Sequence, residues 1–154
     1  MNQDFLSLSL ERSAAVTADQ QPQYAPPSVP LILAADDNET HLLYIKRLLE
    51  SKGFECVTTT SPTAAVRIAA EKRPAAVLCD INFGIGRSNG IDVYTEIRRQ
   101  DAAVPFIIIS AFMQQEMKQR AHDAGITHYL VKPVESSVLM ATLRPLISRT
   151  TNLQ

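Results

Sequence analysis

Polar residues stand directly after four short apolar runs of the sequence. In chain order they are Asp36 with Asp37, Asp80, Ser110 and Lys132. If these runs are parallel strands, their carboxyl ends meet at one edge of a sheet, which is where such sheets gather functional groups. Taken alone, each residue has an ordinary role, because an aspartate can cap a helix and a lysine can be a solvated surface charge. Taken together, they predict one site.

Three of these residues, Asp36, Asp37 and Asp80, would place three carboxylates in one cleft. Like charges that are held close together either raise the pKa of one group sharply or recruit a cation. The donors are all oxygens, without His or Cys among them, and such a set suits Mg²⁺, which prefers octahedral oxygen ligands and keeps several waters. The sequence therefore predicts a magnesium site.

A lysine in the same cleft is an unusual partner for a metal alone. Lys132 makes sense if an anion joins the metal, since lysine binds phosphate as a point charge. Phosphoryl transfer needs mainly positioning and charge neutralisation, and an aspartate carboxylate is a nucleophile that can form an acyl phosphate. Asp80 is the central candidate for that nucleophile.

The elements that must position these residues alternate regularly from Leu31 onward. Five short apolar strands are each followed by an amphipathic helix, which is typical of a parallel sheet covered by helices on both faces. Ser61 and Pro62 predict a helix start, with an N-cap and a proline at the first helical position. Pro145 predicts that the last helix kinks or ends early, because an interior proline costs about 3 kcal/mol.

The chain of 154 residues, 45% of them hydrophobic, is long enough for one α/β core and too short for two full domains. Residues 1–30 are rich in Gln, Ser, Ala and Pro and are expected to form a flexible tail and linker. Within them Phe5–Leu10 alternates apolar and polar residues, and a flexible terminus is favoured there over a strand. The domain is expected over residues 31–148, followed by a short tail over residues 149–154.

The formal net charge of −1, from 15 basic and 16 acidic residues, gives no field that would draw the protein to nucleic acid or to an anionic membrane. No signal peptide and no apolar run long enough to span a bilayer is present, so the protein is expected in the cytoplasm.

Cys56 and Cys79 are expected as reduced core residues. The histidines, His41, His122 and His128, lack ligand spacing, and solvated or helix-end roles are expected for them.

Four motifs in one order resemble the receiver domain of bacterial response regulators, the phosphorylated partners in two-component systems. They are Asp36-Asp37, Val77–Asp80, Ile109–Ala111 and Tyr129–Pro133. The resemblance covers roughly residues 31–148. It implies an α/β, doubly wound, flavodoxin-like fold, in which a five-stranded parallel sheet has the strand order 2-1-3-4-5.

The resemblance also implies a role for each site residue. Asp80 would be the phosphoacceptor, and Asp36, Asp37, Asp80 and the backbone carbonyl of Asn82 would hold Mg²⁺. Ser110 would bind a phosphoryl oxygen.

Lys132 would bind a second phosphoryl oxygen, and the bond before Pro133 would be cis. Movement of the Ser110 hydroxyl would couple to inward movement of Tyr129. That change would be detected on the surface of the fourth helix, the fifth strand and the fifth helix, which is a two-state switch driven by a local change of charge.

The sequence departs from the family pattern in the loop after the phosphoacceptor. Phe83 and Gly84 replace the usual Met-Pro pair, and Gly90 lies two positions further on than the family's glycine, so a longer loop is expected. The glycine spacing G-x-G-x-x-x-G after a third strand is not a dinucleotide-binding fingerprint. Phe112 is at the position that controls access of water to the acyl phosphate, and its bulk predicts slow self-hydrolysis.

The leading functional interpretation is a single-domain response regulator without an output domain of its own. A histidine kinase or a histidine phosphotransfer protein would donate the phosphoryl group, and a downstream protein would bind the switch surface. The domain would catalyse only its own phosphorylation and dephosphorylation. The oligomeric state is left open, with a homodimer among the alternatives.

Two other interpretations belong to different classes of protein. A phosphorylation-independent interaction module is supported by the altered loop but opposed by the retained acidic, hydroxyl and lysine positions. A Mg²⁺-dependent phosphatase would need a second carboxylate two residues after Asp80, where the sequence has Asn82.

Overall fold

The computed structural model describes residues 29–83 and 89–152. Five strands form one parallel sheet in the order β2-β1-β3-β4-β5. The strands are β1 (Leu31–Ala35), β2 (Glu55–Thr59), β3 (Ala76–Asp80), β4 (Phe106–Ser110) and β5 (His128–Val131). The helices are α2 (Glu39–Ser51), α3 (Pro62–Lys72), α4 (Gly90–Gln100), α5 (Gln115–Ala124) and α6 (Ser136–Asn152). The predicted fold and strand order are confirmed.

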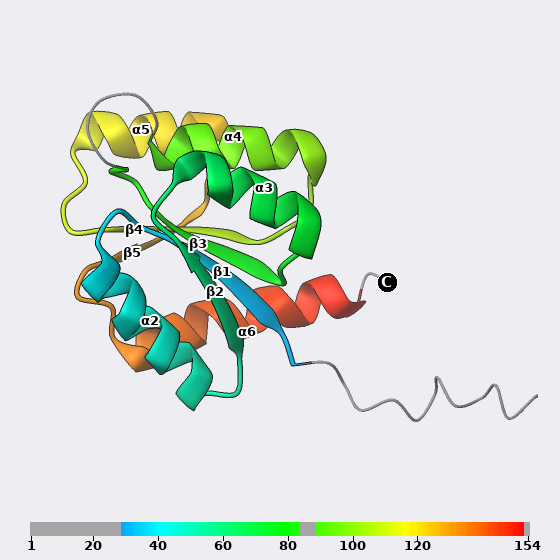
Figure 1. Cartoon of the computed structure of the whole chain (residues 1–154). Coiled ribbons are helices and arrows are strands. Elements are labelled where there is room, and N and C mark those ends of the chain that lie inside the picture. Colours follow the sequence, from blue (N-terminus) through cyan, green and yellow to red (C-terminus); the bar gives the residue numbers. More distant parts are fainter. Residues whose placement is uncertain (1–28, 84–88, 153–154) are drawn as a thin grey trace, which may run out of the picture.

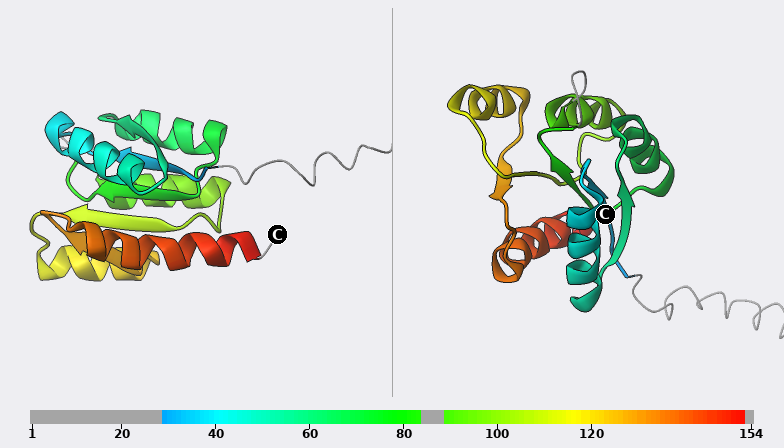
Figure 2. Two further views of the ribbon diagram at one scale, coloured as in Figure 1. Left: turned by 90° about the horizontal axis from the view of Figure 1, so that it is seen from below. Right: turned by 60° about the vertical axis from the view of Figure 1, so that its left-hand side comes forward.

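Helices cover both faces of the sheet (Figure 1). Alternate side chains of β1 point to opposite faces, so Leu33 belongs to the core under α3, α4 and α5, while Ile32 belongs to the core under α2 and α6. Figure 2 shows the same two helical layers from two further directions. Because both faces of β3 and β4 are covered, all five residues of each strand are buried, and their sequences are continuous apolar runs apart from the last residue.

Side-chain caps begin three helices close to the strand ends. Asn38 starts α2 by accepting the backbone N–H of His41, and Ser61 starts α3 by accepting that of Ala64. Asn89 starts α4 in a reciprocal capping box with Asp92. These caps fix the points at which the chain leaves the sheet, and so they fix the loops that carry the polar residues.

The last helix differs from expectation in two ways. It continues through Pro145 instead of ending early, and it extends to Asn152, so residues 149–152 are helical where a tail was expected. Pro145 lies on the exposed side, while Leu143 before it is fully buried and Leu146 after it packs on the same core. Burial on both sides of the proline offsets its cost of about 3 kcal/mol.

Three predicted features lie wholly or largely outside the described residues. They are the flexible tail, of which only residues 29 and 30 are described, the alternating segment Phe5–Leu10 within it, and residues 84–88 of the glycine-rich loop. Within residues 29–83 and 89–152, no helix combines the length and the apolar character needed to cross a membrane.

Candidate functional site

The sheet brings the three predicted carboxylates together. Asp36 follows β1, and Asp80 ends β3, the strand that pairs with β1 in parallel. One oxygen each of Asp36, Asp37 and Asp80 lies within 4.8 Å of the others. Asp36 and Asp80 are buried, whereas Asp37 is exposed, so the cluster opens to solvent on one side. Three carboxylates at this spacing form an oxygen-only donor set that fits Mg²⁺.

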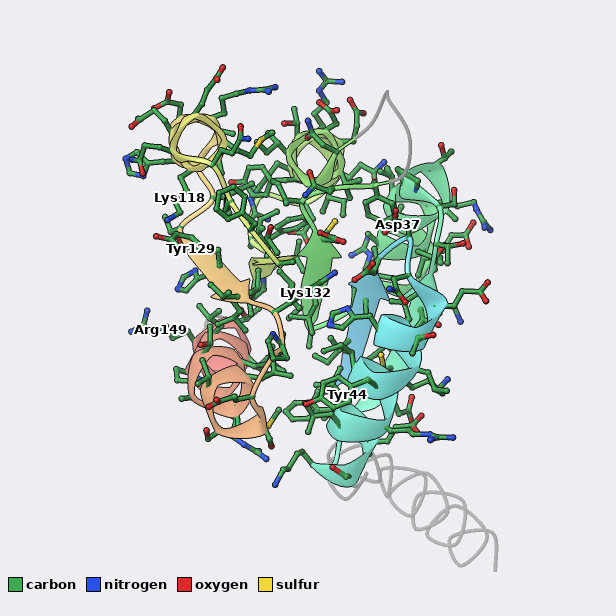
Figure 3. All side chains as sticks on the ribbon, turned by 90° about the vertical axis from the view of Figure 1, so that its left-hand side faces the viewer. Asp37, Tyr44, Lys118, Tyr129, Lys132 and Arg149 are labelled. Carbon is green, nitrogen blue, oxygen red and sulfur yellow. The ribbon has the colours of Figure 1, made fainter. Side chains whose placement is uncertain are left out.

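Lys132 joins two of these carboxylates across the sheet. Its Nζ donates to Oδ2 of Asp36 at 2.8 Å and to Oδ2 of Asp80 at 2.9 Å. The backbone N–H of Lys132 donates to the carbonyl of Ser110 at 2.8 Å, and the bond from Lys132 to Pro133 is cis, as predicted. Asp37 follows β1 and Lys132 follows β5, with β3 and β4 between these two strands, and Figure 3 labels both residues. The lysine therefore lies where a phosphoryl group attached to Asp80 would need a positive charge.

Asp80 is buried, with 6% of its surface exposed. Burial raises the pKa of Asp80, and the negative charge of Asp36 adds to that effect. Hydrogen bonds from Lys132 and from the backbone N–H of Asn82, at 3.1 Å to Oδ1, oppose the rise without cancelling it. Ionised Asp80 is thus a carboxylate that a second cation would stabilise.

Asp36 behaves in the opposite way. Burial alone would raise its pKa, but hydrogen bonds from His41 and Lys132 and from the backbone N–H of Asn38 outweigh it, and the pKa of Asp36 lies well below its usual range. The pKa of Lys132 is raised, because its bonds to the two carboxylates outweigh its own desolvation. The site therefore holds an ionised Asp36 and a charged Lys132.

His41 is the one site residue that sequence reasoning missed. It was expected in a solvated or helix-end role, but its Nδ1 lies 2.6 Å from Oδ2 of Asp36. The available signal was its position: Asn38 caps α2, so a residue three positions later lies on the first turn, beside the carboxylate that precedes the cap. His122 and His128 lie elsewhere, on α5 and at the start of β5.

Among the described residues, no hydrogen bond joins the side chain of Ser110 or Tyr129 to the three carboxylates. Ser110 is buried at the end of β4, and its hydroxyl donates to the carbonyl of Phe112 at 2.8 Å. Tyr129 is 50% exposed, and in Figure 3 it lies away from Lys132 and Asp37. The switch role of Ser110 and Tyr129 stays a prediction. The metal role of the Asn82 carbonyl stays a prediction.

The loop after β3 returns to the sheet at Gly90. Its N–H donates to the carbonyl of Ile81 at 2.9 Å, and a Cβ at this position would lie 2.5 Å from the carbonyl oxygen of Asp80. Only glycine allows α4 to begin this close to the backbone of Asp80.

The two cysteines take no part in the site. Both are buried and free, as predicted. Burial raises the pKa of Cys56 to about 11 and raises that of Cys79 well above its ordinary value. Neither thiol is a nucleophile at neutral pH, because the thiolate is the reactive form.

The model of the response regulator receiver domain family matches residues 32–144 of the chain. The chain belongs to this family. The match begins at the second residue of β1, covers the other four strands and ends inside α6, so it includes every residue of the candidate site.

Individual relatives agree with the family assignment. The transcriptional regulatory protein PrrA of Mycobacterium bovis is 34% identical over 120 residues, which are 78% of this chain and 51% of that protein. The receiver domain structure from Clostridium thermocellum is 30% identical with a TM-score of 0.75, and the match covers 82% of this chain and 100% of that one. The chain thus spans about half the length of PrrA, and the expectation of a single-domain regulator stays a prediction.

A third relative bears on the metal. The receiver domain of the sensor histidine kinase PA1611 from Pseudomonas aeruginosa has a magnesium ion coordinated in its active site cleft. It is 28% identical, with a TM-score of 0.71, and the match covers 79% of this chain and 99% of that one. Receiver domains bind Mg²⁺ in an acidic pocket, and the corresponding cluster is present here.

Proposed function

We propose that this receiver domain accepts a phosphoryl group on Asp80, with Mg²⁺ held by Asp36, Asp37, Asp80 and the carbonyl of Asn82. The observation that carries the proposal is the bridge of Lys132 between Asp36 and Asp80, at 2.8 and 2.9 Å, beside a third carboxylate. A lysine would not be needed for a metal alone, but it is suited to a phosphate that joins the metal.

In the proposed reaction, an oxygen of Asp80 attacks the phosphorus of a phosphorylated histidine on a kinase or phosphotransfer protein. The bond between phosphorus and the histidine nitrogen breaks, the electron pair stays on that nitrogen, and an acyl phosphate forms. Lys132 moves from the Asp80 carboxylate to a phosphoryl oxygen and neutralises part of its charge. Bound Mg²⁺ supplies further charge neutralisation at the transferred group.

The proposed switch uses Ser110 and Tyr129. The Ser110 hydroxyl exchanges the carbonyl of Phe112 for a phosphoryl oxygen, and Tyr129 moves from its exposed position into the space this opens. The output surface is formed by α5, β5 and α6. It already exposes Tyr129, Val131 and Val138, which are 50%, 66% and 46% exposed, and these side chains suit a protein partner. We place the protein in the cytoplasm, where such kinases present their phosphorylated histidines.

A phosphorylation-independent interaction module remains the second candidate, because the loop from Phe83 to Gly90 departs from the family pattern. Catalysis beyond the domain's own phosphorylation and dephosphorylation is not proposed, because Asn82 is not a general acid.

Incubation with acetyl phosphate, with and without Mg²⁺, tests the proposal through the intact mass of the protein. We expect a Mg²⁺-dependent adduct of one phosphoryl group that disappears in Asp80→Asn and persists in Asp123→Asn, a change at an exposed aspartate of α5. Labelling that persists in Asp80→Asn would place the acceptor elsewhere. Absence of any adduct on the wild-type protein would favour the phosphorylation-independent module.

A further inference from the structure

His41 makes a short contact that the proposed reaction does not use. Its Nδ1 lies 2.6 Å from Oδ2 of Asp36, and the two side chains are 16% and 4% exposed. An ionised carboxylate only accepts hydrogen bonds, so Nδ1 carries the proton and donates it. A hydrogen bond to a buried charged group is among the stronger ones in a protein.

His41 is not a fourth ligand of the cation site. Within residues 29–83 and 89–152, the set of potential ligand atoms that lie within 4.8 Å of one another comprises Asp36, Asp37 and Asp80. His41 contacts only Asp36 among these three in the hydrogen bonds described. It therefore lies behind the cluster, on the side of Asp36 that faces α2.

The hydrogen-bond donors around Asp36 show what the contact with His41 contributes. Oδ1 accepts the backbone N–H of Asn38 at 2.9 Å, while Oδ2 accepts both His41 and Lys132. In the proposed reaction, on which this inference rests, Lys132 leaves for the phosphoryl group. His41 is then the side chain that still holds Oδ2.

We propose that His41 is a positioning residue that keeps the Asp36 carboxylate oriented toward the cation while Lys132 moves to the phosphoryl group. Residues that hydrogen-bond a metal-ligating carboxylate fix its orientation, and their loss typically lowers metal affinity about 10- to 100-fold.

Both the backbone and the ring of His41 are held in place. The backbone N–H of His41 donates to the Asn38 side chain at 3.1 Å, and the ring of His41 is stacked beside that of Tyr44, with the ring centroids 6.4 Å apart. The Tyr44 hydroxyl donates to the carbonyl of Val134 at 2.8 Å, two residues beyond Lys132. Figure 3 shows Tyr44 on α2, on the side that faces α6. The ring is therefore oriented before any cation binds, as a positioning role requires.

Two substitutions separate hydrogen bonding from packing. His41→Leu removes the donor, whereas His41→Asn can keep an N–H donor near the place of Nδ1, since both nitrogens are bonded to Cγ. Titration of the unphosphorylated protein with MgCl₂, followed by calorimetry, gives the Mg²⁺ dissociation constant. We expect the Mg²⁺ dissociation constant to rise about 10-fold or more in His41→Leu. In His41→Asn we expect it to lie close to the wild-type value. His122→Leu, on α5, is the matched control and should leave it unchanged.

The outcomes are distinct from those of the phosphorylation test. An unchanged dissociation constant in His41→Leu would overturn the inference, and so would an equal weakening in His41→Leu and His41→Asn, because that would show a packing effect. If His41→Leu does not fold, His41→Asn alone decides: wild-type affinity supports the inference, and a 10-fold loss overturns it. If the wild-type protein and the His41 variants show the expected Mg²⁺ affinities but the wild-type protein forms no acyl phosphate, only the proposed function is refuted.

Discussion

Two buried carboxylates share one lysine, yet their pKa values shift in opposite directions. Asp36 receives donors from His41, Lys132 and the backbone of Asn38, and its pKa falls; Asp80 receives fewer donors and lies next to a negative neighbour, and its pKa rises. The environment thus favours the ionised form of Asp36 and disfavours the ionised form of Asp80. Phosphorylation would move negative charge from the buried carboxylate oxygens to the phosphoryl oxygens, which is consistent with the role proposed for Asp80.

Phe112 gives a prediction at the residue scale. Its backbone carbonyl accepts the Ser110 hydroxyl, so its bulky side chain belongs to the loop beside the phosphoacceptor position. If that bulk limits access of water, Phe112→Ala shortens the lifetime of the acyl phosphate; about 1 kcal/mol of barrier corresponds to about fivefold in rate. The measurement is the decay of phosphorylated protein by intact mass after acetyl phosphate is removed.

Leu43→Ala is the control for Phe112→Ala, because Leu43 is also a large exposed apolar residue but lies on α2. We expect its lifetime to match that of the wild-type protein. A Phe112→Ala variant that dephosphorylates no faster than Leu43→Ala would remove the role assigned to this side chain.

At the scale of elements, the decisive contact joins the end of β3 to the start of α4. A Cβ on Gly90 would lie 2.5 Å from the carbonyl oxygen of Asp80 and 3.0 Å from Cα of Ile81, both of them backbone atoms that cannot turn aside. Gly90→Ala therefore forces α4 away from the sheet. We expect the free energy of unfolding to fall by about 1 to 3 kcal/mol, measured by urea denaturation.

Gly53→Ala is the matched comparison, since nothing lies within 4 Å of a Cβ there and the strain comes only from a φ of +90°. It should cost about 1 kcal/mol and leave Mg²⁺ affinity unchanged. Gly90→Ala should also weaken Mg²⁺ binding, because it displaces the backbone of Asp80. Equal Mg²⁺ affinities in the two variants would contradict this account of Gly90.

For the whole molecule, the raised pKa of Asp80 links the site to stability. The folded-state pKa lies above the unfolded value of about 3.9, so ionised Asp80 destabilises the fold once the pH exceeds both values. In EDTA at pH 7, Asp80→Asn should therefore unfold at a higher temperature than the wild-type protein. The difference should shrink as the pH falls through the folded value and vanish below about pH 4, where Asp80 is protonated in both states.

Thermal unfolding at a series of pH values measures this difference, with Asp123→Asn as the control for removal of an exposed carboxylate. Asp36 contributes with the opposite sign, because its lowered pKa stabilises the fold above about pH 4 and that stability is lost only as the pH falls further. A wild-type protein that is more stable than Asp80→Asn at pH 7 in EDTA would show that the ion pair with Lys132 outweighs the burial.

The sequence by itself determined the alternation of strands and helices, the polar residue at each strand end and the buried cysteines. These follow from local patterns: apolar runs such as Phe106–Ile109, caps such as Ser61, and the fact that parallel strands bring their carboxyl ends to one edge. The strand order was available only from the family motifs, since hydrophobic patterns do not specify which strands pair.

Tertiary structure decided what local rules could not. Pro145 stays inside α6 because burial of the residues on both sides offsets its local cost, and local propensity does not include that burial. His41 has no motif of its own. The Asn38 cap places it on the first turn of α2, but the contact of its Nδ1 with Asp36 also depends on how α2 packs against the end of β1. The opposite pKa shifts of Asp36 and Asp80 likewise depend on which hydrogen-bond donors the fold places around each carboxylate. One of these donors, Lys132, is distant in the sequence, so local patterns do not predict its contacts.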